Sequence, residues 1–134
     1  MQLGAGDVIW FYSKETNPYK WKMHVAACVA KRWFFLINSK GHYPGSFPIH
    51  AHENTFLDHD SYIECGSVMH YTDEEIAAAL HQDAGNLVGR LAGSTMQKLL
   101  EYLPTVDQLT GEQIHIITQE VRQQLTALLA LPLA

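Results

Sequence analysis

The 134-residue sequence lacks any long hydrophobic run. No apolar segment approaches the roughly 20 residues that a membrane-spanning helix needs, although 47% of the residues are hydrophobic. The N-terminus also lacks a basic segment followed by a long apolar stretch, which is the pattern of a signal peptide. We therefore expect a cytoplasmic protein with no membrane partner. The length fits a single domain over residues 1–134.

Motifs of common catalytic folds are missing as well. The chain has no Gly-rich phosphate loop and no nucleophile elbow. Its histidine-containing segments, His50-Ala51-His52 and Asp58-His59-Asp60, do offer ligand types that transition metals accept. Their spacing matches no metal-hydrolase motif, so we expect His50, His52 and His59 not to converge on one ion. We also expect no cofactor.

Cysteine is scarce. Cys28 and Cys65 are the two cysteines of the chain, and each falls in a predicted strand. In a reducing compartment this placement favours two buried thiols, and a disulfide between them stays an alternative.

Positive charge is rare overall but concentrated near the N-terminus. The formal net charge is −5, yet residues 1–45 carry six cationic and two acidic side chains, whereas residues 46–134 carry three and twelve. Salt screens the acidic part beyond about 8 Å, so the basic end can still meet a polyanion. Such lysines also commonly just solvate loops.

Alternating and apolar segments predict strands in the first half of the chain. We place them at about 7–12, 22–30, 33–38 and 61–65, with a further short strand near 47–52. Strong bending of this sheet is expected over residues 6–65. The later part reads as helical, because capping boxes at Thr72, Ser94 and Thr110 open helices over 72–82, 94–103 and 110–130. The expected class is α+β, mainly β: a small antiparallel barrel over 6–70 and a helical extension over 72–130 packed on it.

Three segments in this order resemble the MazF/PemK/CcdB-like toxins. Gly6-Asp7-Val8-Ile9-Trp10 matches their Gly-Asp-apolar-apolar-Trp opening. Lys22-Met23-His24 and Asn38-Ser39 occupy the places of a basic residue before one strand and of small hydroxyl residues after the next. Ser61-Tyr62-Ile63-Glu64-Cys65 is similar to the late strand of the family. The resemblance covers roughly residues 6–82 and implies an SH3-like barrel.

The resemblance also implies a function. Toxins of this family are generally homodimers that cleave single-stranded RNA without a metal and are held in check by an antitoxin protein. The family's Arg-Pro pair is absent here, so Lys22 or His24 would have to replace it, and Asn38 or Ser39 falls at the position of a threonine. The apolar stripe of the last predicted helix and the tail over 128–134 favour a homodimer as well.

These considerations give one expected site. Its catalytic residues would be Lys22, His24, Asn38 and Ser39. Its RNA-binding residues would be Lys14, Lys20, Trp21, Lys40, His42 and Tyr43, since aromatic faces beside lysines suit stacking on bases. A tight turn at 31–32 would set residue 24 opposite about residue 39.

Each assignment has a structural alternative. His24 could be a strand-start histidine stacked on Trp21 or Tyr19, and Ser39 an ordinary turn residue. Trp10 and Trp33 are expected in the core. At the level of the whole chain, the main alternative to a toxin-like RNA endonuclease is a non-catalytic module that binds a protein or nucleic acid. A third alternative, a metal-dependent hydrolase, rests only on the histidines.

Overall fold

The computed structural model describes residues 3–13 and 20–130, without the side chains of residues 13 and 20. The elements follow the chain in this order: β1 (Asp7–Ser13), β2 (Lys20–Cys28), β3 (Trp33–Asn38), β4 (Ser46–Ile49), β5 (Ser61–Glu64), β6 (Met69–His70), α1 (Asp73–Gln82), the 3₁₀ turn η1 (Ala84–Asn86), β7 (Leu87–Arg90), α2 (Gly93–Tyr102), the 3₁₀ turn η2 (Leu103–Thr105) and α3 (Gly111–Leu129). Within these ranges, no helix is both long and apolar enough to cross a membrane.

The strands form one curled antiparallel sheet in the order β4-β5-β3-β2-β1-β7. β6 pairs with the start of β3 and β5 with its end, so both lie along the same edge of β3. Pro48 lies in β4, an edge strand, where its missing N–H costs no ladder bond. The α+β class with a mainly antiparallel, bent sheet is confirmed.

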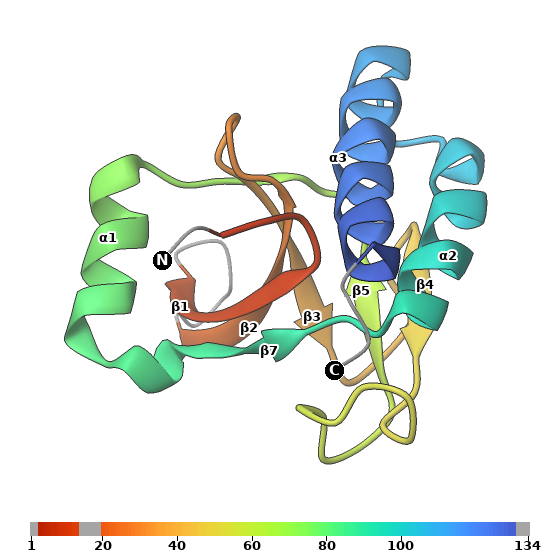
Figure 1. Cartoon of the computed structure of the whole chain (residues 1–134). Helices are drawn as coiled ribbons and strands as arrows, with labels where there is room; N and C mark the ends of the chain where they lie inside the picture. Colours follow the sequence, from red (N-terminus) through yellow and green to blue (C-terminus); the bar gives the residue numbers. More distant parts are fainter. Residues whose placement is uncertain (1–2, 14–19, 131–134) are drawn as a thin grey trace.

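Helices cover both faces of this sheet. Figure 1 shows α1 on one side of the curled sheet and α2 and α3 on the other. Successive residues of β3 alternate between the two cores: Phe34 and Leu36 pack toward α1, whereas Phe35 and Ile37 pack toward α2 and α3. Burial on both faces explains why this strand is a continuous apolar run.

The segment between the first two helices contains a strand that the sequence analysis missed. β7 pairs with β1, and the Arg90 Nε atom donates a 2.7 Å hydrogen bond to the buried Asp7 carboxylate. The Gly-Asp turn that opens the chain therefore fixes β7 to the sheet, with Gly6 at a φ of 91°. The region after residue 72 is not purely helical.

Two of the three expected capping boxes are confirmed, at Thr72 and Thr110. The third is wrong: α2 begins at Gly93, and its N-cap Ala92 makes no side-chain cap bond. The Ser94 hydroxyl instead donates to Glu53 at 2.8 Å, and the buried Asn54 side chain accepts from the Ala92 N–H at 2.9 Å. A distant loop thus stabilises the start of α2.

Other details also differ from expectation. His24 lies opposite Leu36 and not near residue 39, because the turn spans four residues and the pairing is irregular between Ala26 and Cys28. Trp10 is 38% exposed and does not belong to the core, whereas Trp33 packs against it. The prediction of two buried free thiols, Cys28 and Cys65, is confirmed.

Candidate functional site

The expected meeting of Lys22 with Asn38 occurs where β2 starts and β3 ends. The Lys22 Nζ atom donates to the Asn38 amide oxygen, and the Asn38 amide nitrogen donates to Glu64 at 2.9 Å. Hydrogen bonds therefore connect an ammonium group to a carboxylate across β2, β3 and β5. The nearby carboxylate weakens the positive potential that a phosphate group would require.

His24, the expected general base, is fully buried. Its Nδ1 atom lies 3.0 Å from the Lys22 carbonyl oxygen, which can only accept, so Nδ1 carries a proton. In the neutral ring, Nε2 then accepts a 2.7 Å hydrogen bond from the Tyr71 hydroxyl. The ring packs edge-on against Phe11 and Tyr71 rather than on Trp21, and Tyr19, the other expected neighbour, lies outside the described residues.

Burial also determines the protonation state of this histidine. Loss of hydration lowers the pKa of His24 from 6.5 to about 4, and the charge of Lys22 acts in the same direction, while the hydrogen bond to the Lys22 carbonyl opposes them. We call Phe11, His24, Phe34 and Tyr71 the His24 cluster. In this structure the cluster is a sealed packing unit from which His24 cannot reach an RNA hydroxyl.

The remaining residues of the expected RNA site lie on the loop after β3. Ser39, Lys40, His42 and Tyr43 are exposed, and the rings of His42 and Tyr43 lie 4.3 Å apart. Lys14 lies outside the described residues, and of Lys20 the structure describes the backbone alone.

The histidine-rich segments do not come together as one ligand set. The rings of His50 and His52 lie 5.6 Å apart, but the His59 ring contacts its neighbour Asp58 at 2.7 Å. In the described ranges, no group of three His, Cys, Asp or Glu side chains has an arrangement that could hold a metal ion.

An aromatic surface that the sequence analysis recognised only in part lies between the β1–β2 end of the sheet and α1. One hollow of about 380 Å³ is lined by aromatic rings of the two strands and of Tyr71, and by the α1 side chains facing them. Its main lining residues are Phe11, Tyr12, Trp21, Tyr71, Glu75 and Gln82.

A second hollow of about 350 Å³ adjoins the first, since both are lined by Trp21 and Gln82. It is completed by Trp10, Asp83 and Asn86. We call the two hollows together the aromatic groove. Trp10, Tyr12 and Trp21 are 38%, 45% and 37% exposed along it, and the Tyr12 and Trp21 rings meet edge-on at 5.8 Å.

Of the groove, Trp21 alone was among the expected site residues. Trp10 and Tyr12 alternate with the buried Ile9 and Phe11, so strand periodicity separates the two sets once one face is known. The sequence signal was therefore present in β1. What it lacked was the position of α1, which forms the other wall.

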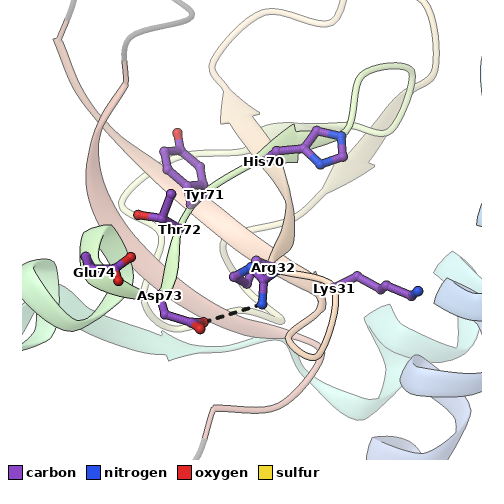
Figure 2. A pocket seen from close by; sticks show the side chains of 7 residues that line it. All are labelled: Lys31, Arg32, His70, Tyr71, Thr72, Asp73 and Glu74. Atoms are coloured by element: carbon purple, nitrogen blue, oxygen red, sulfur yellow. Dashed lines mark ion pairs between the residues drawn. The ribbon is translucent and has the colours of Figure 1, made fainter.

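Another hollow, of about 460 Å³, opens beside the turn between β2 and β3 (Figure 2). Arg32 lies there at a φ of 60°, and its guanidinium is 3.7 Å from the Asp73 carboxylate, as the dashed line in Figure 2 shows. Lys31 and Glu74 complete two cations and two carboxylates around it. With balanced charges and an acidic first turn of α1, this hollow does not favour an anion.

Comparison with known proteins supplies no family for this chain. It matches none of the protein-family models searched and none of the curated proteins.

Proposed function

We propose that this protein is a non-catalytic interaction module whose binding surface is the aromatic groove. One observation carries the proposal: Trp10, Tyr12 and Trp21 stand together, each more than a third exposed, over two adjoining hollows. Large aromatic side chains held in water lose apolar hydration when a partner covers them, and Trp and Tyr are enriched at interfaces for this reason.

The state of the expected catalytic residues supports the same function. A general base must come within hydrogen-bond reach of the proton it removes, and the His24 ring is sealed behind Phe11 and Tyr71. The Lys22 ammonium is bonded to Asn38, which in turn bonds to Glu64. These groups are engaged in holding strands together.

Binding to three probe classes tests the proposal. Single-stranded RNA of mixed sequence, neutral oligosaccharides and proline-rich peptides are each titrated into the parent, Tyr12→Ala and Tyr43→Ala. Tyr43 is the matched control, because it is 44% exposed but lies on the loop after β3. The proposal predicts that one class binds the parent and Tyr43→Ala and is lost from Tyr12→Ala, with RNA left intact. Cleavage of the RNA, or no groove-dependent binding of any class, contradicts it.

The contact between Lys22 and Asn38 favours a second candidate function. In it, the chain is a toxin-like, metal-independent RNA endonuclease of the MazF/PemK type, with an SH3-like barrel, a cytoplasmic location, a homodimeric state and an antitoxin partner. Its support is that two residues expected from the resemblance do meet, next to the exposed Ser39 and Lys40. Induced expression should then arrest growth and produce new RNA 5′ ends, and Lys22→Ala should abolish both effects.

A further inference from the structure

We propose that the aromatic groove binds an extended, proline-containing peptide segment that carries an arginine or lysine. This inference rests on the proposed function and names the partner class for that same surface. Shape, hydrogen-bonding capacity and charge of the groove each support it.

The shape suits a polyproline II helix. Trp21 and Gln82 line both hollows, so the two hollows adjoin along these side chains. A polyproline II segment has about three residues per turn, so prolines on successive turns can enter two adjoining hollows lined by aromatic rings. The helix is already extended before binding, so little chain entropy is lost when it enters.

The groove also offers the donors that such a segment needs. A polyproline II backbone has no internal hydrogen bonds, so its carbonyl oxygens accept from the partner. Trp10 and Trp21 line the groove, are each more than a third exposed, and carry indole N–H groups that can donate. A proline ring packs on the apolar face of an aromatic ring, while the backbone carbonyl oxygen beside it accepts from the indole N–H.

Charge selects among the ligands that stack on aromatic rings. Glu75 lines the first hollow and Asp83 the second, and the other described residues of both hollows are uncharged. Two carboxylates repel the phosphates of a nucleic acid and attract a cationic side chain. The Asp83 carboxylate accepts from the Gly85 N–H at 2.8 Å, which holds it beside the second hollow.

The experiment is a calorimetric titration with a synthetic peptide of roughly 12 residues, rich in proline and carrying two arginines, which spans about 37 Å as polyproline II. Trp21→Ala and Tyr12→Ala should each weaken its binding by about tenfold or more, as truncation of a central aromatic contact does. Tyr43→Ala should bind like the parent. Circular dichroism and thermal unfolding of each variant establish that it is folded.

A separate experiment tests whether the charge of Asp83 selects a cationic peptide. Asp83→Asn keeps an acceptor for the Gly85 N–H and removes the negative charge. It should weaken binding of the arginine peptide and leave unchanged the binding of a peptide in which both arginines are glutamines. Equal effects on both peptides would overturn the charge selection.

The outcomes separate this inference from the function on which it rests. Groove-dependent binding of RNA or of an oligosaccharide, with no binding of the peptide, keeps the interaction module and overturns the peptide partner. Peptide binding that survives both groove variants places the peptide elsewhere and overturns the inference. No groove-dependent binding of any probe overturns both.

Discussion

The same two strands build a closed aromatic region and an open one. His24 is fully buried behind Phe11 and Tyr71, and the same two rings also line the aromatic groove, whose Trp10, Tyr12 and Trp21 face water. Phe11 and Tyr12 are neighbours in the chain, yet the first is 3% exposed and the second 45%. The difference teaches that aromatic content alone does not identify a site: the strand face on which a ring lies decides whether the ring is buried in the core or exposed to water.

Hydrogen bonding distinguishes the two regions as well. In the closed cluster, both nitrogens of the His24 ring are engaged, by the Lys22 carbonyl and the Tyr71 hydroxyl. A buried polar group needs such partners, because leaving one unmade costs about 1–3 kcal/mol. The Trp10 and Trp21 side chains of the groove are instead each more than a third exposed, so water or a ligand can approach them.

The largest expected contrast is between truncations at these neighbouring positions. Phe11→Ala should lower the free energy of unfolding by about 3–5 kcal/mol, because it empties a site stacked on Tyr71 at 4.5 Å and in edge contact with His24 and Phe34. Tyr12→Ala should cost about 1 kcal/mol or less and should act on binding instead. Urea denaturation of both variants measures this, and similar losses at the two positions would break the distinction.

The next largest effect is a loss of folding stability in acid that comes from the buried His24. The folded-state pKa of His24 lies near 4, below its ordinary 6.5, so the unfolded chain takes up the proton first. The stability from neutral, buried His24 is therefore fully present above about pH 6.5 and is lost as pH falls toward 4. The lowering corresponds to a loss on the order of 3 kcal/mol.

A difference between variants isolates this histidine. His24→Gln should lose less stability than the parent between pH 7 and 4, because it has no proton to take up there. His42→Gln, at an exposed ring, should follow the parent. The lowered pKa values of Glu53 and Asp60 add acid sensitivity to all three proteins alike, so they cancel in the comparison. Parallel curves for parent and His24→Gln would contradict the sealed cluster.

The smallest expected effect concerns α1, the helix that contacts both the His24 cluster and the aromatic groove. Thr72→Ala and Thr110→Ala each remove the side-chain half of a capping box, at α1 and α3 respectively, and should each cost about 1 kcal/mol. Only Thr72→Ala should also weaken peptide binding, because α1 forms one side of the groove. Equal binding by the two variants would separate the groove from α1.

Local patterns predicted much of this fold. The alternation of apolar and polar residues located most of the strands. Thr72 and Thr110 marked two helix starts, because each capping box joins residues only three positions apart in the sequence. What failed depends on distant contacts. β7 is held by Asp7, far away in sequence, and the N-terminus of α2 is held by Asn54. Neither contact leaves a periodic signal in its own segment.

The sequence also predicted one part of the candidate site, the contact between Lys22 and Asn38, and missed most of the rest. The antiparallel pairing of consecutive strands brought Lys22 to Asn38 as expected, although an irregularity near Ala26 moved the register. Glu64, which completes that set of bonds, was not expected there. The groove could not be predicted, because its second wall comes from a helix whose placement on the sheet no local pattern specifies.

The most direct test of the account follows the indole N–H signals of the three tryptophans by ¹H–¹⁵N NMR as the arginine-containing proline-rich peptide is added. Trp10 and Trp21 line the groove, whereas Trp33 packs against the core beside His70 and serves as an internal control. The account predicts that the Trp10 and Trp21 signals shift together in a saturable manner while the Trp33 signal stays in place. No shift at Trp10 and Trp21, or a shift confined to Trp33, would contradict it.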